Sequence, residues 1–132
     1  MDEKKQKIKS ILEEMGYKPK IDDDGDVYLK YQMKTFYFMP STEVDDYLTV
    51  WFPQLLAVDE GEEAEFMAIC NKCTREVRMA KFYVDSSLTT VGASCEFFFN
   101  NDESLKYSIQ QSLDILGRAR TVFLQTQAAL YE

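Results

Sequence analysis

The N-terminal segment places apolar side chains at helical spacing along an otherwise charged stretch. The apolar positions are Ile8, Ile11, Leu12 and Met15. Residues three and four apart share one face of a helix, and Gly16 follows them, where glycine commonly ends a helix. The pattern therefore predicts an amphipathic helix over residues 3–15.

The pattern changes to alternation after this helix. Asp24 and Gly25 are typical of a tight turn, and β-forming residues then predict strands over residues 27–32 and 35–39. A turn near residues 33 and 34 joins them into a hairpin. If that turn has two residues, the core face pairs Tyr31 with Phe36 and Leu29 with Phe38, and the other face pairs Lys30 with Tyr37 and Tyr28 with Met39.

The middle of the chain predicts a further strand and a second helix. The stretch DYLTVWF alternates between two faces and predicts a strand at residues 47–52, before Pro53. Asp59 can cap a helix whose first turn contains glutamates, since carboxylates favour the positive end of the helix dipole. The glutamates are Glu60, Glu62 and Glu63, and the apolar positions of the helix are Phe66, Met67, Ile69, Cys70 and Cys73.

Two more strands and a C-terminal helix complete the pattern. The strands are predicted near residues 77–84 and 88–99 and are joined by the polar turn DSS. From Asn101 onward, helical spacing predicts one long helix. The residues that share one face of the last strand are Val91, Ala93, Cys95, Phe97 and Phe99, and the apolar positions of the helix are Leu105, Ile109, Leu113, Leu116 and Phe123.

The order of elements predicts an α+β fold, an antiparallel sheet with flanking helices. The order reads α-β-β-β(-β)-α-β-β-α, and strands that are adjacent in sequence and joined by tight turns pair antiparallel. At 132 residues the chain has the length of one domain that buries a core without disulfides or metals. We therefore expect a single domain over residues 1–132.

Both faces of the predicted strands carry large apolar side chains. One face includes Leu29, Phe38, Leu48 and Val50. Because side chains alternate along a strand, the opposite face also needs a cover. A helix of the same chain or a second subunit can cover it, or it binds a partner protein, since Tyr, Trp and Met are enriched in interfaces. The candidate partner-binding residues on that face are Tyr28, Tyr37, Met39, Tyr47 and Trp51.

Charge narrows the choice of partner. The net charge is −8 and the sequence pI is about 4.6. Nucleic acids and anionic membranes are bound mainly through cationic residues, so we expect neither. A basic or hydrophobic segment of another protein suits this surface better. The N-terminus lacks the apolar stretch of a signal peptide, and no apolar run reaches the roughly 20 residues of a membrane span. The sequence therefore predicts a cytoplasmic protein with reduced thiols.

The string AICNKCTR is the one motif with catalytic character. A thioredoxin-type CxxC needs its attacking thiol at a helix N-terminus, whereas Cys70 and Cys73 come late in the predicted helix. They share a face with Phe66 and Ile69, so we interpret them as core side chains. A structural zinc site needs four ligands, and the chain offers only Cys95 beyond the pair and no histidine.

The remaining motifs give no sign of catalysis. The absence of histidine removes Ser-His-Asp and Cys-His systems. In a calcium loop centred on the string DDDGD, Lys20 and Tyr31 would stand at the first and twelfth ligand positions, and neither replaces the oxygens required there. We interpret the string as a solvated hairpin turn. No nucleotide-binding glycine pattern occurs, so we expect no catalytic, cofactor or metal site.

Three stretches carry a resemblance to known proteins: FPQLLAVDE at residues 52–60, NKCTREV at residues 71–77 and AKFYVD at residues 80–85. They are similar to the YbjN-like family and, more distantly, to the type III secretion chaperone-like fold. The family pattern has two asparagines, separated by two residues, before a lysine and an aromatic residue in the next strand. Asn71, Lys81, Phe82 and Tyr83 match this pattern, whereas Thr74 occupies the second asparagine position.

The resemblance implies a fold and a mode of action, and it implies no catalytic residues. Chaperones of this architecture are small, acidic and usually dimeric, and they hold an extended partner segment. The YbjN-like branch is described as regulatory. Together with the residue patterns, this predicts a noncatalytic protein-binding module, chaperone-like or regulatory, that forms a homodimer. It would capture a partner helix, or add a partner strand along an exposed edge.

Two other functions remain open at this point. One is a thiol- or metal-dependent enzyme that uses Cys70 and Cys73. The other is a purely structural homodimer.

Overall fold

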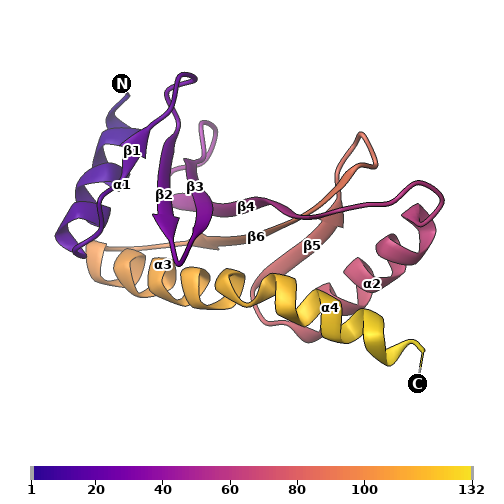
Figure 1. The fold of residues 1–132 in the computed structure, drawn as a ribbon. Helices are drawn as coiled ribbons and strands as arrows, with labels where there is room; N and C mark the ends of the chain where they lie inside the picture. Colours follow the sequence, from indigo (N-terminus) through magenta and orange to yellow (C-terminus); the bar gives the residue numbers. More distant parts are fainter. Residues whose placement is uncertain (1, 132) are drawn as a thin grey trace.

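The structure, a computed structural model that describes residues 2–131, contains four helices and one antiparallel sheet (Figure 1). The helices are α1 (Glu3–Glu14), α2 (Glu63–Glu76), α3 (Asp102–Gly117) and α4 (Ala119–Ala129). The strands are β1 (Lys20–Ile21), β2 (Val27–Tyr31), β3 (Lys34–Pro40), β4 (Tyr47–Ala57), β5 (Ala80–Val84) and β6 (Thr90–Phe98). Their order across the sheet is β1-β2-β3-β4-β6-β5. The predicted α+β class is confirmed, with four strands before α2.

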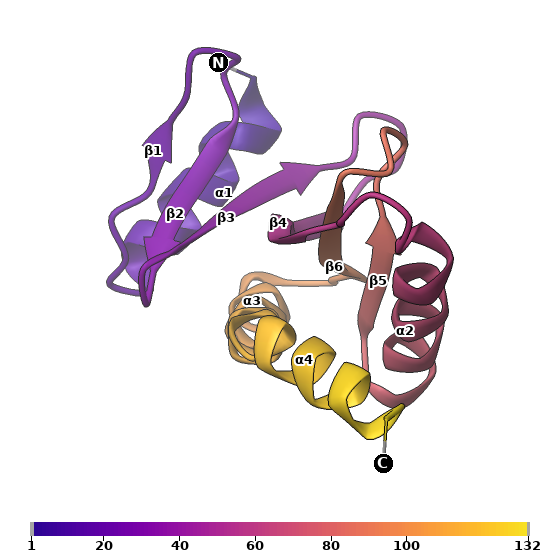
Figure 2. The same ribbon diagram turned by 45° about the vertical axis from the view of Figure 1, so that its right-hand side comes forward.

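The helices and the sheet form two layers around one core. On the first face of the sheet, side chains of neighbouring strands meet in rows, one of which runs from Phe38 through Val50 and Cys95 to Ala80. In Figure 2, α1 lies behind the β1–β2–β3 part of the sheet, and α2 lies beside β5. The buried helix residues of the core are Ile8, Ile11, Leu12, Phe66, Ile69, Cys70, Cys73, Leu105, Ile109, Leu113, Leu116, Ala119 and Phe123.

Local signals in the sequence determine the extent of α1. The Asp2 carboxylate accepts a hydrogen bond from the Lys5 N–H at 2.8 Å and so caps the first turn. The helix ends at Glu14, and Gly16 takes a φ of 93°. Glycine adopts this left-handed conformation at little cost, because it has no Cβ. The helix predicted over residues 3–15 is confirmed to within one residue.

The register of the β2–β3 hairpin differs from the prediction. Gln32 and Met33 form the turn, with φ values of 52° and 67°, whereas a turn at Met33 and Lys34 was expected. Two residues with positive φ are typical of a type I′ turn, whose twist suits a hairpin. The observed pairs include Leu29 with Phe36, Tyr28 with Tyr37 and Val27 with Phe38. A shift by two residues keeps every side chain on its predicted face, so alternation alone could not determine it.

β4 continues through Pro53, although a strand ending before this proline was predicted. It covers Tyr47–Ala57 and pairs with β6 along both halves, with a bulge between Phe52 and Leu56. Its pairing with β3 stops at Trp51. Proline has no N–H to donate to a neighbouring strand. Pro53 therefore ends the ladder on one side of β4 while the strand itself continues.

α2 begins later than predicted, because the chain before it is not helical. The helix starts at Glu63, and Gly61 takes a φ of 89°, which interrupts helical backbone. Asp59 is therefore not the cap; its carbonyl accepts a hydrogen bond from the Glu62 N–H at 3.0 Å. Of the predicted apolar positions, Phe66, Ile69, Cys70 and Cys73 are buried and Met67 is exposed.

The long C-terminal helix is divided into α3 and α4. Arg118 separates them, with φ −101° and ψ 0°. Gly117 immediately before it weakens the helix, since glycine in a helix interior costs roughly 0.5–1 kcal/mol relative to alanine. The predicted apolar stripe nevertheless continues, because Leu116 and Phe123 are both fully buried. None of the helices in residues 2–131 is both long enough and apolar enough to cross a membrane.

The last two strands are shorter than the predicted segments 77–84 and 88–99. Met79 and Leu88 have φ values of 70° and 62°, which lie outside the extended conformation of a strand. β5 and β6 therefore begin just after these residues.

The two hairpin residues Phe36 and Met33 allow a matched test of the core. Phe36 is fully buried against the ring of Phe52, with centroids 5.1 Å apart, whereas Met33 is fully exposed. We expect Phe36→Ala to lower the free energy of unfolding by about 3–5 kcal/mol, because it leaves a cavity. Met33→Ala should change it by less than about 0.5 kcal/mol. Urea unfolding measures both, and equal effects would contradict the assigned faces of the hairpin.

Candidate functional site

The second face of the sheet carries a ladder of large side chains. The residues predicted to bind a partner all lie on it, together with two others that prediction missed. We call this set the aromatic face. Its members are Tyr28, Tyr37, Met39, Tyr47, Trp51, Tyr83 and Phe98.

Neighbouring rings of the aromatic face contact one another across strands. The ring centroids of Tyr28 and Tyr37 are 5.9 Å apart, and those of Tyr37 and Trp51 are 5.7 Å apart. Tyr47 and Phe98 are closer, at 4.7 Å. Aromatic pairs attract at these separations, and cross-strand pairs stabilise a sheet. The ladder therefore keeps this face ordered even when no partner is bound.

Tyr47, Glu96 and Lys81 form a hydrogen-bonded group on this face of the sheet. The Tyr47 hydroxyl donates to Glu96 Oε2 at 2.6 Å, and Lys81 Nζ donates to the same oxygen at 2.9 Å. The hydrogen bond from Tyr47, together with Lys81, holds the pKa of Glu96 below its ordinary value. The same bond to Glu96 raises the pKa of Tyr47. Glu96 is thus a fixed negative charge at neutral pH, satisfied within the face.

Trp51 is held from the other side by Tyr83. The Trp51 indole Nε1 donates a hydrogen bond to Tyr83 Oη, and burial raises the pKa of Tyr83. The ring of Tyr83 lies over Gly92, where a Cβ would come within 2.5 Å of Tyr83 Oη and 2.6 Å of its Cζ. Only glycine leaves room for this ring, so Gly92 helps to fix the orientation of Trp51.

Sequence reasoning missed Tyr83 and Phe98, although alternation gave a signal for both. Alternation in AKFYVD places Tyr83 opposite in face to Phe82. The face assigned to Phe97 and Phe99 likewise leaves Phe98 on the opposite face, but alternation within one strand does not show which residue it meets. The register shows Phe98 paired with Tyr47.

None of the four helices in residues 2–131 covers the aromatic face (Figure 2). Their buried residues pack with the first face, and no member of the aromatic face belongs to that core. Phe98 is 69 % exposed, and most of the other members are half-buried by their neighbours. The alternative in which a helix of the same chain covers this face is therefore wrong for the described residues.

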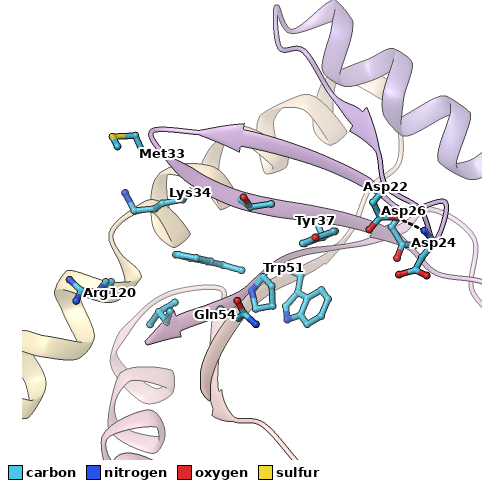
Figure 3. Close-up of a pocket in the computed structure, with 13 residues that line it drawn as sticks. Asp22, Asp24, Asp26, Met33, Lys34, Tyr37, Trp51, Gln54 and Arg120 are labelled. Atoms are coloured by element: carbon cyan, nitrogen blue, oxygen red, sulfur yellow. Dashed lines mark hydrogen bonds between the residues drawn. The ribbon is translucent and has the colours of Figure 1, made fainter. Parts of the chain in front are cut away.

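The sheet opens beside Tyr37 and Trp51, between β3 and the second half of β4 (Figure 3). We call this opening the notch. Its volume is about 670 Å³, within the range of ligand-binding clefts. Lys34 and Arg120 lie at one end and the β1–β2 turn at the other, with Tyr37 and Trp51 between them (Figure 3).

The string DDDGD forms the β1–β2 turn, as interpreted from the sequence. The Asp22 carboxylate accepts hydrogen bonds from the N–H groups of Asp24 and Asp26 at 3.0 and 2.9 Å. Asp26 also pairs with Lys5 at 3.2 Å. Burial raises the pKa of Tyr37, and the negative charges of this turn raise it further. The turn therefore makes one end of the notch acidic.

α2 closes part of the outer edge of β5. The Thr74 hydroxyl accepts a hydrogen bond from the Phe82 N–H at 2.8 Å and donates one to the Phe82 carbonyl at 3.2 Å. A strand added at this edge would need both groups. Addition of a partner strand is therefore blocked at Phe82. Thr74, which departs from the asparagine of the family pattern, still satisfies this edge through its hydroxyl.

The cysteine pair lies in the second half of α2, where the sequence placed it. Cys70 and Cys73 are both buried. Burial raises the pKa of Cys70 to about 12 and also raises the pKa of Cys73. A thiol nucleophile needs a lowered pKa. These surroundings support the interpretation of the pair as core side chains.

The chain is similar in sequence to one protein family. The model of the YbjN family, described as "Putative bacterial sensory transduction regulator", matches residues 5–125. None of the curated proteins matches the chain.

Solved structures show the same fold. YbjN from E. coli, described as "a putative transcription regulator", has a TM-score of 0.73 at 12 % identity, covering 95 % of this chain and 92 % of that chain. An uncharacterized protein from Methanothermobacter thermautotrophicus has a TM-score of 0.51 at 14 % identity, covering 95 % and 97 %. A chain of the ExsC–ExsE complex has a TM-score of 0.54 at 16 % identity, covering 86 % and 90 %. The predicted resemblance in fold, including the secretion chaperone-like fold, is confirmed.

Gly92→Ala should disturb Trp51 through Tyr83. The new methyl group displaces the Tyr83 ring and breaks its bond to the indole, and overpacking of this kind costs about 1–3 kcal/mol. Trp51 is the single tryptophan of the chain, so its emission and its indole N–H resonance report the change. In the Tyr83→Ala background, Gly92→Ala should cost much less. An equal cost in both backgrounds would contradict the contact.

The thiols should react with an aromatic disulfide reagent only after unfolding. With a pKa near 12 for Cys70, the thiolate fraction at pH 8 is very small, and we expect labelling at least about 100-fold slower than in the unfolded chain. The folded Ser86→Cys variant, which adds an exposed thiol on the β5–β6 turn, controls for reagent access. Rapid labelling of two thiols in the folded wild type would contradict this prediction and support the alternative of a thiol-dependent enzyme.

Proposed function

This chain belongs to the YbjN family, and on that premise we propose that it is a noncatalytic protein-binding module, chaperone-like or regulatory. In this proposal the aromatic face holds a segment of a partner protein, and the chain acts as a homodimer in the cytoplasm. The chemistry of the cysteine pair does not favour the alternative of a thiol enzyme, because burial raises both pKa values.

The observation that carries the proposal is a sheet face with aromatic side chains and no helix over it in residues 2–131. Tyr and Trp are enriched among the residues that dominate binding energies, because they bury a large area at a low entropic cost. The polar atoms of Trp51 and Tyr47 are already bonded, Trp51 to Tyr83 and Tyr47 to Glu96. A partner can therefore cover the rings without leaving those groups unpaired.

The comparisons support this direction without naming a partner. The family description refers to a regulator, and one structural neighbour was solved as a complex of two proteins, ExsC and ExsE. The proposal extends protein binding to this chain. It carries over no residue from either protein, since the likeness to them is one of fold.

Phe98→Glu should weaken partner binding and leave the fold intact. Phe98 is 69 % exposed on the aromatic face, and Tyr107 is 68 % exposed on α3, so Tyr107→Glu is a matched control on the helical layer. We expect Phe98→Glu to weaken binding of a purified partner at least about tenfold, because it puts a charge among the aromatic anchors. Tyr107→Glu should leave the affinity unchanged. Partners are first captured from lysate of the source organism and then titrated in a two-component assay.

Light scattering of the same three proteins tests the homodimer. A wild-type mass near twice 15.4 kDa, reduced to the single-chain mass only in Phe98→Glu, would mean that the aromatic face joins two copies. That result without any captured partner would assign the protein to the structural homodimer. Equal partner affinity of Phe98→Glu and Tyr107→Glu would contradict the proposed binding surface.

A further inference from the structure

We propose that the notch binds an extended segment of a partner protein with a basic residue at one end and an acidic residue four positions away. The proposal rests on the proposed function, because it takes the occupant to be a protein segment. It adds where the segment binds and which order of charge it carries. The backbone, the charges and the length of the notch each support it.

The main chain of Thr35 faces the notch. In a two-residue hairpin, the flanking pair, here Tyr31 and Lys34, exchanges hydrogen bonds, so the next residue points its N–H and C=O away from β2. The hydrogen bond from the Ser41 N–H to the Tyr47 carbonyl, at 3.0 Å, follows the same alternation on the β4 side of β3. Thr35 therefore presents both main-chain groups toward β4.

Pro53 leaves the Thr35 carbonyl without a donor from β4. Continuing the β3–β4 register beyond Tyr37 and Trp51 would place Pro53 opposite Thr35. Proline cannot donate a hydrogen bond, and β4 bulges after Phe52. The β3–β4 ladder runs from the pair Tyr37–Trp51 to the pair Pro40–Leu48 and does not include Thr35. An N–H of a bound segment can supply the donor that Pro53 lacks, and main-chain bonds of this kind give an added strand its affinity.

The two ends of the notch carry opposite charge (Figure 3). Asp24 lies at the acidic end, and Lys34 and Arg120 lie at the basic end. Asp24 and Arg120 are exposed. In the part of the chain that is described, neither side chain takes part in a hydrogen bond or an ion pair with another side chain, so both charges are free for a ligand. Complementary charges fix the orientation of a bound segment.

The spacing of the ends matches a short extended segment. The acidic turn precedes Val27, which pairs with Phe38, and the basic end begins at Lys34. From Lys34 to Phe38 the strand advances by four residues, which is about 13 Å at roughly 3.3 Å per residue. Because β4 pairs with β3 from Tyr37 onward, an extended ligand reaches the acidic end by crossing over Tyr37 and Trp51. Two of its side chains meet the charged ends when they stand first and fifth in a five-residue segment.

A wholly basic segment is the main rival occupant. The chain has a net charge of −8 and attracts cations at long range. At the basic end of the notch, however, a second cationic side chain would meet Lys34 and Arg120. Repulsion of this kind rejects the wrong ligand while the acidic end selects the right one. The charge order therefore favours a dipolar segment over a basic one.

Trp51 lines the notch and is the single tryptophan of the chain, so its emission follows binding directly. Four acetylated, amidated pentapeptides serve as probes: Lys-Val-Thr-Val-Glu, Glu-Val-Thr-Val-Lys, Lys-Val-Thr-Val-Lys and Glu-Val-Thr-Val-Glu. At about 0.15 M salt, where the screening length is about 8 Å, we expect one of the two dipolar peptides to bind at least about fivefold more tightly than either the doubly basic or the doubly acidic peptide.

Charge reversal gives the sharper result. Arg120→Glu should reduce the discrimination against the doubly basic peptide, because only Lys34 then remains to repel its second cation. Asp24→Lys should reduce the discrimination against the doubly acidic peptide in the same way, although Asp22 and Asp26 remain at that end. Arg75→Glu on α2 and Asp59→Lys before α2 change the net charge equally at exposed positions away from the notch, and they should preserve the dipolar preference. If Arg75→Glu and Asp59→Lys change the order of peptide affinities as much as the two notch variants do, only net charge matters. That result would overturn the proposal.

Other outcomes also overturn it. The doubly basic peptide could bind the wild type as tightly as the dipolar ones, or no peptide could change the emission of Trp51. An emission that changes on dilution without peptide would show that a second copy fills the notch. Phe98 lies outside the notch, so the partner titration with Phe98→Glu is an independent test. If no peptide binds but Phe98→Glu still weakens partner binding, the proposal for the notch is wrong. The proposed function is not contradicted by that result.

Discussion

An antiparallel sheet with helices on one face must keep its other face ordered by contacts within that face. Here the second face does so through ring pairs such as Tyr37 with Trp51 and through the hydrogen bond from Trp51 to Tyr83. The rings are large enough to shield one another, and the polar atoms of Trp51 and Tyr47 are bonded within the face. The face can therefore stay folded in water and still offer a partner apolar area in which these two groups remain paired. The same arrangement that stabilises the free protein also prepares it for binding.

Pro53 introduces a second constraint, because it stands within a strand that has neighbours on both sides. A proline in such a strand removes one donor, and this chain resolves the conflict by directing the missing donor toward β3. The β4–β6 ladder continues past the proline through a bulge, while β3 stays with its hairpin partner β2 beyond Tyr37. One residue thus opens the sheet locally without breaking β4.

Patterns of spacing predicted most of the fold, and they failed where a single backbone conformation decides. Alternation identified the core side of β2 and β3, but it cannot distinguish registers that differ by two residues, so the turn at Gln32 and Met33 was missed. Spacing likewise does not reveal the conformation of a glycine. The positive φ of Gly61 moves the start of α2 to Glu63. The predicted aromatic residues do share one face, whereas the notch was not predictable, because it depends on which side of β4 lacks the proline N–H.

The edges of the sheet explain why a partner strand would enter at the notch. At β5 the outward N–H and carbonyl of Phe82 are already bonded to Thr74, so α2 occupies the place of a further strand. At the opposite edge, β1 contributes only Lys20 and Ile21, which is a short ladder for a partner to extend. The Thr35 groups differ from both, because they lie inside the sheet, beside two aromatic rings and between opposite charges. Main-chain bonds supply affinity without sequence preference, so selectivity there has to come from those rings and charges.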